Sequence, residues 1–455
     1  MAALPSTRAT SPNILDWSCD GSGSGGQAWY DLEIAASPTN AEQIFAGGVN
    51  VWKSLDGGAN WQITGHWYGG CGVQAVHADQ HVFEYSPVNN KLFIGNDGGI
   101  YSSSNNGSSW TIHTNGLVIT QIYKIGQDRY DSTHLIFGAQ DNGTSSFIGG
   151  IWYDTHGGDG MESIIDPEMP QYSYASVYYG DITRYTNNNS GMNIAANGSY
   201  GITEEGAWVT PYILDESDGN TMYIGYKNLW RGSDVRNYPS WQKITNNLGG
   251  TNSVNCKVVE QSSADPSILY FSREDGTLFR TDDIRITQPS WENLTSSLPA
   301  SGNINDIETH PTLPNTVFIV LNNKVYRSDN KGQSWLDITG NLPDVSYTTI
   351  ELYKNANDGI YVGSNLGVWY RDASMTQWVN FSQGLPIDAS INEIEIAYDN
   401  NNPINDRIRV GTYGRGVWSS DVWRGTPSAN FSGTPLVIPA GGQVQFTDLS
   451  DGVPS

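Results

Sequence analysis

The sequence predicts an all-β fold, specifically a multi-bladed β-propeller, and three observations support this. Short apolar-alternating runs are separated by clusters of Gly, Asn, Asp and Ser, which is typical of short strands joined by tight turns. A short motif recurs along the chain, and a four-strand unit can be aligned around it. Gly (51), Trp (16) and Tyr (25) are abundant among the 455 residues, and no segment shows sustained helical periodicity.

The recurring motif is an apolar pair followed by Ser-x-Asp/Asn-x-Gly-x-x-Trp. Its clean copies are Ser54, Asp56, Gly58 and Trp61, then Ser103, Asn105, Gly107 and Trp110, then Ser328, Asn330, Gly332 and Trp335. Looser copies end at Trp241, Trp291 and Trp378. The Asp or Asn is expected to bond backbone amides of a hairpin turn, the Gly to adopt positive φ, and the Trp to cover the hairpin. These residues are therefore predicted to be structural.

This motif resembles the Asp-box (BNR) repeat of sialidases, xyloglucanase-type glycosidases and sortilin-type receptors. The resemblance implies that each copy lies on the turn between the third and fourth strands of a blade. Two blades can be read before residue 115, and later ones begin near Gln121, Asp159, Trp208, Val254, Ile304, Thr348 and Ile391. Eight to ten four-stranded blades are expected, with nine as the best estimate. The last blade lacks a fourth strand, which ATSPNIL near the N-terminus is expected to supply, closing the ring.

The propeller is expected to span residues 1–424. Residues 425–455 contain a Pro/Ser linker and two alternating strands, and they resemble the start of a PKD-like (Ig-like) β-sandwich. The stretches GGQAWYDLEIA, HADQH, GAQDNGT and GGDGME resemble propeller modules of large Bacteroidetes secreted proteins, which carry PKD-type modules and a type IX secretion sorting domain. The resemblance implies an extracellular or cell-surface protein, such as an adhesin. No signal peptide is recognisable, and we expect the chain to be part of a longer one.

The net charge of −24 argues against nucleic acid as a partner and disfavours docking on anionic lipid. No stretch is apolar enough to insert into a membrane. An acidic, solubilising surface explains the charge, while Ca²⁺ or another divalent cation stays open as a ligand. Cys19 and Cys71 lie in Gly-rich stretches on loops expected to be adjacent, so a disulfide and two free thiols are both open.

Ligands of such a fold are expected on the face opposite the motif turns. The candidate ligand-binding residues there are His77, Asp79, Gln80, His81, Gln140, Asp141, Asn142, His156, Asp159, Glu162, Tyr413 and Arg415. HADQH, AQDNGT and GGDGME are expected to converge, and Asp306 and Glu393 lie where later inner strands begin. His77, Asp79 and His81 are weak metal-ligand candidates. Their alternative role is to lock loops and cap strands.

Three functions remain open at this point. The first is a non-enzymatic binding or scaffold module that recognises a glycan or an extracellular protein. The second is a glycoside hydrolase or lyase using paired carboxylates, for which Asp31, Asp79 and Asp159 are candidates by position. The third is a sortilin-like peptide receptor or assembly factor. The aromatic side chains that could stack on sugars are Trp29, Trp67, Tyr68, Tyr178, Tyr179, Tyr226 and Tyr413.

Overall fold

The computed structural model describes residues 12–189, 191–248, 254–425, 431–434 and 443–448. It consists of antiparallel β-sheets with three short 3₁₀ segments, η1 (Tyr178–Gly180), η2 (Thr295–Ser297) and η3 (Pro403–Asn405). No helix in the described part of the chain has the length and apolarity needed to cross a bilayer. The all-β prediction is therefore confirmed. The chain divides into two compact units, Met1–Ile119 and Thr120–Ser455, and each is described by itself.

The first unit contains two four-stranded sheets, each with its strands in sequence order. They are β1 (Glu33–Ala36), β2 (Ile44–Gly47), β3 (Val51–Ser54), β4 (Gln62–Gly65), and β5 (Gln80–Tyr85), β6 (Leu92–Asn96), β7 (Gly99–Ser103), β8 (Thr111–Ile112). Phe45, Phe83 and Trp110 belong to the apolar cluster shared by the two sheets. Cys19 and Cys71 form a disulfide, with their Cα atoms 6.0 Å apart. Of the two alternatives left open by the sequence, the structure therefore shows the disulfide.

The second unit begins with three four-stranded sheets and continues with three more and a three-stranded one. The first three are β9 (Ile122–Gln127), β10 (His134–Ala139), β11 (Gly143–Ile148), β12 (Ile151–His156); β13 (Ser163–Ile165), β14 (Tyr172–Val177), β15 (Asp181–Thr186), β16 (Met192–Ala195); and β17 (Tyr212–Asp215), β18 (Asp218–Gly225), β19 (Leu229–Ser233), β20 (Ser240–Lys243). Every neighbouring pair of strands is antiparallel, so each sheet is a meander.

The remaining four sheets continue the same pattern. They are β21 (Cys256–Gln261), β22 (Leu269–Arg273), β23 (Leu278–Thr281), β24 (Glu292–Asn293); β25 (Ile304–Thr309), β26 (Val317–Leu321), β27 (Lys324–Ser328), β28 (Leu336–Asp337); β29 (Tyr347–Tyr353), β30 (Gly359–Ser364), β31 (Gly367–Arg371), β32 (Val379–Asn380); and β33 (Ser390–Ala397), β34 (Arg407–Tyr413), β35 (Gly416–Asp421). The first strand of each sheet is the inner strand, because these strands surround the central cavity described below.

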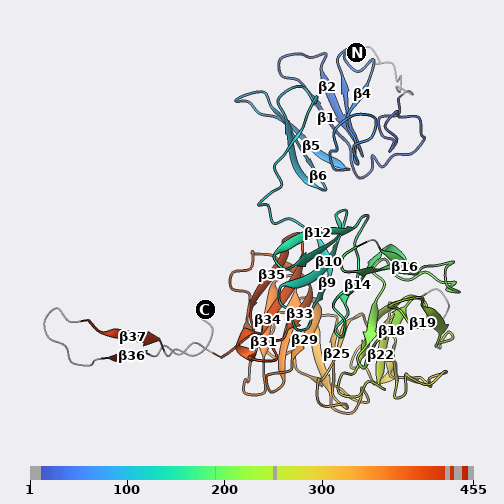
Figure 1. Cartoon of the computed structure of the whole chain (residues 1–455), viewed down its shortest axis with the longest axis vertical. Helices are drawn as coiled ribbons and strands as arrows, with labels where there is room; N and C mark the ends of the chain where they lie inside the picture. Colours follow the sequence, from blue (N-terminus) through green and yellow to red (C-terminus); the bar gives the residue numbers. More distant parts are fainter. Residues whose placement is uncertain (1–11, 190, 249–253, 426–430, 435–442, 449–455) are drawn as a thin grey trace. The chain divides into compact units, whose positions relative to one another are not determined.

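The seven sheets of the second unit form a closed ring. Apolar clusters join successive sheets, and one cluster joins the last sheet to the first through Ile122, Ile125 and Val417. The inner strands β9 and β33 lie side by side (Figure 1). Each sheet therefore buries both of its faces against neighbours, which is the defining property of a propeller blade.

This closure changes the expected ring and the expected domain boundaries. Nine sheets of the repeat type are present, but two lie in the first unit and seven close a ring by themselves. The expected single propeller over residues 1–424 is therefore replaced by these two units. Residues 12–15 of ATSPNIL form a bend and turn in the first unit, and residues 9–11 lie outside the described residues. No described strand pairs with the free edge of β35.

The three clean motif copies form the turns expected of them, each between the third and fourth strands of a sheet. In the first copy, the Ser54 hydroxyl accepts a hydrogen bond from the Gly58 amide at 2.8 Å, and Asp56 accepts one from the Asn60 amide at 2.8 Å. The other two copies repeat both bonds. The three Gly residues have φ of 92°, 76° and 85°, a region that favours glycine.

The motif Trp also joins neighbouring sheets, including where the rest of the motif has degenerated. In four copies its indole Nε1 donates to a backbone carbonyl of the preceding sheet. The pairs are Trp110 with Thr64, Trp241 with Ile194, Trp291 with Ile244, and Trp378 with Ile338. In these four copies the Trp therefore links its own sheet to the preceding one.

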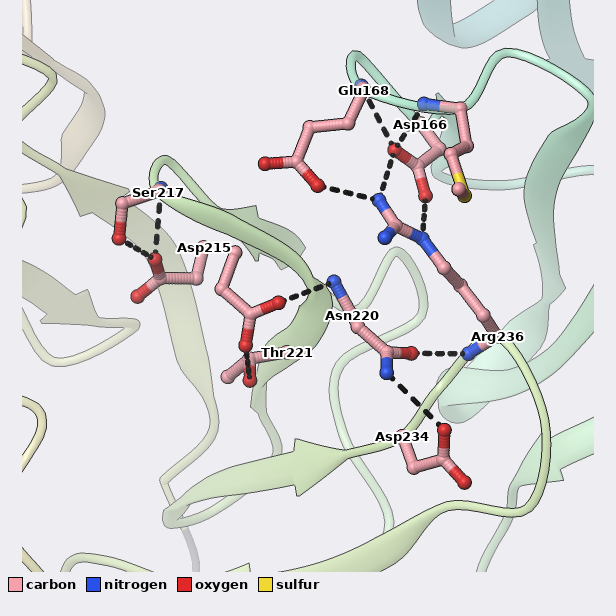
Figure 2. Close-up of polar contacts among 10 residues, drawn as sticks. Asp166, Glu168, Asp215, Ser217, Asn220, Thr221, Asp234 and Arg236 are labelled. Carbon is pink, nitrogen blue, oxygen red and sulfur yellow. Dashed lines mark hydrogen bonds and ion pairs between the residues drawn. The ribbon is translucent and has the colours of Figure 1, made fainter.

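One degenerate copy adds an ion-pair contact between sheets. Arg236, in the turn after β19, bonds both carboxylate oxygens of Asp166 at 2.6 and 2.8 Å (Figure 2). Asp166 follows β13 and is fully buried. Arg236 also reaches Glu168 at 2.9 Å. This bidentate pair fixes the sheet of β17–β20 against that of β13–β16.

Residues 431–434 and 445–448 form an antiparallel pair, β36 (Phe431–Thr434) and β37 (Gln445–Asp448). Two strands were expected in this segment. Its resemblance to a PKD-like module stays a prediction.

Candidate functional site

Five of the seven inner strands of the second unit carry a β-bulge near their start. The bulged residues are Tyr123, Lys257, Asn305, Thr348 and Asn392. Bulges re-aim side chains, and here they aim them at the next blade. Asn305 Nδ2 donates to the Tyr347 carbonyl at 2.7 Å, and Asn392 Nδ2 donates to the Ile122 carbonyl at 2.9 Å. The contact that links successive blades thus also links the last blade to the first.

Two carboxylates beside these bulges bond backbone amides of the following blade. Asp306 accepts from the Ile350 amide at 2.9 Å. Glu393 accepts from the Ile125 amide at 2.6 Å and pairs with Lys124 Nζ at 2.7 Å. Burial raises the pKa of both carboxyls, while Lys124 acts in the opposite direction. Both residues, predicted at inner-strand starts, therefore bridge blades.

The inner strands enclose a cavity of about 970 Å³ on the ring axis. Nine carboxylate and four cationic side chains are among its lining residues, so the cavity is strongly acidic. Burial, followed by repulsion from Glu393, raises the pKa of Glu162 to about 8. Burial likewise raises the pKa of Glu260 to about 8. The cavity therefore holds carboxyl groups that are partly protonated near neutral pH.

An exposed group of three aromatic side chains, here called the aromatic shelf, consists of Tyr178, Tyr179 and Trp208. Their exposed fractions are 43%, 46% and 41%. The Tyr178 and Trp208 rings are stacked, with centroids 5.3 Å apart and an interplanar angle of 14°. Tyr179 meets Trp208 edge-on at 5.5 Å. Because η1 carries both tyrosines and the Tyr179 amide donates to the Trp208 carbonyl at 3.3 Å, the backbone holds the shelf together.

The shelf borders the cavity through one side chain. Trp208 lines the cavity together with the bulge residue Tyr123. Trp208 Nε1 donates to the Tyr123 hydroxyl at 3.1 Å, and that hydroxyl donates to Gln140 Oε1 at 2.9 Å. The Tyr413 hydroxyl bonds the same Gln140 oxygen. A continuous band of aromatic and polar groups therefore lies at one mouth of the acidic cavity.

Several residues predicted from the sequence lie in or beside this band. Gln140 and Tyr413 are part of it, and Asn142 Nδ2 donates to the Gln140 carbonyl at 2.9 Å. Asp159 accepts a hydrogen bond from the Asp141 amide at 2.7 Å, so AQDNGT and GGDGME do meet. Asp159 holds the loop in this position, which is the structural role that the sequence left open.

Three other predicted residues have separate environments. Glu162 lines the cavity. The His156 ring bonds the Tyr185 hydroxyl, and burial lowers the pKa of this histidine. Arg415 Nη1 donates to the carbonyl of Gly414 in its own turn at 2.9 Å.

HADQH lies in the first unit, beside the predicted catalytic candidate Asp31. Gln27 Nε2 bridges two carboxylates, at 2.6 Å from Asp79 and 3.2 Å from Asp31. Asp31 is 1% exposed, and burial raises its pKa. Because HADQH belongs to the other unit, its convergence with AQDNGT and GGDGME stays a prediction. The roles of Asp31, Asp79 and Asp159 as catalytic groups stay predictions as well.

The histidines of HADQH make separate contacts in this unit. His81 Nε2 lies 2.8 Å from Asp97, and His77 Nδ1 lies 3.4 Å from the Ala78 carbonyl. Gln80 is buried and donates to the His77 carbonyl at 2.6 Å, which is a loop-locking contact. Within the described residues of the first unit, no three His, Cys, Asp or Glu ligand atoms lie within 4.8 Å of one another. The metal-ligand role of His77, Asp79 and His81 stays a prediction.

Sequence reasoning missed Trp208 and the carboxylates deep in the cavity. Trp208 carries no motif, and only the fold places it against Tyr178. The deep carboxylates did leave a signal, because a Val-Glu or Ile-Glu pair recurs at the same register of four inner strands. The acids of these pairs are Glu260, Glu308, Glu351 and Glu395.

The ring and its cavity define the second unit as a β-propeller. No known family model matches the chain, and no curated protein matches it significantly. Among solved structures, the chain is similar to the Niastella koreensis GH74 enzyme, with a TM-score of 0.39 and 13% sequence identity. That match covers 85% of this chain and 74% of the other.

Proposed function

We propose that the second unit binds a glycan at the aromatic shelf, as an extracellular binding module. The observation that carries the proposal is the shelf itself. Its three residues are 41–46% exposed, and one of them, Trp208, borders the cavity. Exposed aromatic groups beside a concave site are typical of ligand recognition.

The surroundings of the shelf favour a sugar over a purely apolar ligand. Aromatic rings offer flat apolar faces to the C–H faces of sugar rings. The Tyr123 and Tyr413 hydroxyls and the Gln140 amide next to them can exchange hydrogen bonds with sugar hydroxyls. A site that combines flat apolar area with a few fixed polar groups suits a carbohydrate chain.

The disulfide supports the proposed extracellular location. Cys19 and Cys71 are joined within the first unit. Disulfides form and persist in oxidising compartments and are rare in the cytosol. The proposed partner is accordingly an extracellular or cell-surface glycan.

A glycan array probed with the full chain tests the proposal. We expect binding that Trp208→Ala reduces and Tyr238→Ala leaves unchanged. Tyr238 is a matched control because it is 78% exposed in the same unit, in the turn before β20. Equal binding by the two variants, or no glycan bound at all, would refute the proposal.

A glycoside hydrolase is a second candidate, favoured by one observation. Glu162 has a pKa of about 8 and can carry a proton at neutral pH, as a general acid must. Glu393, paired with Lys124, lines the same cavity. Release of reducing sugar from any array ligand, abolished by Glu162→Gln with binding retained, would establish this activity. Binding without release from any of the ligands would exclude it for those glycans.

A further inference from the structure

Four consecutive blades place a carboxylate at one level of the cavity. These residues, called the carboxylate tier, are Glu260, Glu308, Glu351 and Glu395, and all line the cavity. Each lies three residues after the bulged residue of its inner strand. At about 3.3 Å per residue, the tier lies about 10 Å from the level of the bulged residues. Tyr123 is the bulged residue of β9, so the shelf and the tier belong to one continuous site.

Most of the tier lacks partners. Glu260 accepts from the Thr309 hydroxyl at 2.8 Å. Glu308, Glu351 and Glu395 make no hydrogen bond or ion pair with any other described residue. Burial and mutual repulsion raise the pKa of these three carboxyls well above the usual range. Either protons or an external cation must therefore neutralise them.

The cationic side chains of the cavity are already engaged elsewhere. Lys124 pairs with Glu393 at 2.7 Å, Arg129 with Glu216 at 3.0 Å, Lys257 with the Asn305 side chain at 2.8 Å, and Lys354 lies 3.8 Å above the Tyr398 ring. None of these contacts is a direct pair with the tier. The charge of Arg129 acts on Glu351 and Glu395 without a direct contact, and burial and repulsion outweigh it, so the pKa of both carboxyls stays raised.

A buried polar group gives a second, independent sign of a ligand. Ser163 lines the cavity and is 1% exposed. Its hydroxyl has no hydrogen-bond partner among the described residues. Buried hydroxyls are normally paired, and a polar ligand in the cavity would provide the partner.

We propose that the glycan recognised at the aromatic shelf carries free amino groups, and that one ammonium group enters the cavity and pairs with the carboxylate tier. This inference rests on the proposed glycan-binding function and names its ligand class. Sugar rings stack on the shelf, and the amine end of the chain extends inward. The same carboxylates repel uronates and sulfated sugars, because like charges in a partly desolvated cavity cannot be screened by bulk solvent. The size of the cavity is within the range of ligand pockets.

Calorimetric titration of the full chain with three oligosaccharides tests this inference. The probes are a glucosamine hexamer, an N-acetylglucosamine hexamer and a galacturonate hexamer, used near neutral pH, where the amines are still partly charged and carboxyls with a raised pKa begin to ionise. We expect the glucosamine hexamer to bind at least about tenfold more tightly than the acetylated one, and the galacturonate hexamer to bind least.

Two variants distinguish the contribution of the carboxylate tier to binding from that of the aromatic shelf. The double variant Glu308→Gln/Glu351→Gln keeps the side-chain shape and should lose most of the tenfold preference while still binding the acetylated hexamer. Glu292→Gln removes the same kind of charge from β24, where the carboxylate is 44% exposed, and should keep the preference.

The outcomes distinguish this inference from the proposed function. Equal affinity for the glucosamine and acetylated hexamers, or a preference unaffected by the double variant, overturns the inference and leaves shelf binding intact. Failure of every glycan to bind overturns both. Folding of the double variant is checked by its circular dichroism, and the single variant Glu351→Gln replaces it should it fail to fold.

Discussion

Lys124 and Glu393 form an ion pair of 2.7 Å between the first and last inner strands of the second unit. Glu393 also accepts the Ile125 amide at 2.6 Å, so one carboxylate holds both a side chain and the backbone of the first blade. Both partners are partly buried, with side-chain exposures of 31% and 13%. This contact, together with Asn392 and the Ile122 carbonyl, closes the ring.

The first prediction concerns this closure. Glu393→Ala leaves the Lys124 ammonium and the Ile125 amide without an acceptor, so we expect a loss of about 3 kcal/mol in the unfolding free energy of the second unit. Urea denaturation of the full chain measures it. Lys324→Met serves as the control, because its pair with Asp337 is exposed and should contribute less than about 1 kcal/mol. Similar losses for the two variants would mean that Glu393 does not lock the ring.

The second prediction concerns pH. Cavity carboxyls such as Glu162 and Glu260 have their pKa raised from 4.5 to about 8 in the folded chain, so the folded state binds more protons than the unfolded state between these values. Their contribution to stability is full below about pH 4.5 and is lost as the pH rises through about 8. We therefore expect stability to fall over this interval.

The variant Glu351→Gln isolates this effect, because the amide does not ionise and burial raises the pKa of the native carboxyl. At about pH 5 it should match the native chain in stability, and at about pH 8 it should be more stable by ~1 to 2 kcal/mol. Thermal unfolding at both pH values measures the difference. If the stability of Glu351→Gln changed with pH in parallel with that of the native chain, the raised pKa of Glu351 would be contradicted. The stability of Glu292→Gln should change with pH in parallel with that of the native chain.

The third prediction concerns the disulfide. Cys19 and Cys71 are separated by 52 residues, and a crosslink closing a loop of this length stabilises by about 3 to 4 kcal/mol. Both lie in the first unit, while the free Cys256 is buried in the second. Calorimetry of Cys71→Ser in the full chain should show a lowered transition for the first unit and an unchanged one for the second. A shift of both transitions together would contradict this independence.

Local patterns in the sequence predicted the blades well, because each blade is a local meander with a repeated turn. Ser54, Asp56 and Gly58 form the turn that their chemistry requires. Ring closure was not predictable in the same way. It depends on contact between β9 and β33. Ile125 of β9 and Glu393 of β33 are 268 positions apart, and no local sequence pattern indicates which blades become neighbours.

Sequence neighbours in the candidate site also separate in space. His156 and Glu162 are six positions apart, yet the first contacts Tyr185 between blades and the second lines the cavity. The difference follows from their strands, because His156 ends the outer strand β12 of one blade and Glu162 directly precedes the inner strand β13 of the next. The recurring Ile-Glu pairs could have been found by aligning inner strands at their bulges, whereas Trp208 required the fold.

Glycan binding at the aromatic shelf is tested most directly by one measurement. The affinity of the full chain for its best array ligand is compared by calorimetric titration with the affinities of Trp208→Ala and Tyr238→Ala. Loss of one stacking ring should weaken binding by about tenfold or more in Trp208→Ala, with Tyr238→Ala unchanged. Native affinity in Trp208→Ala would contradict the central claim that the shelf is the binding surface.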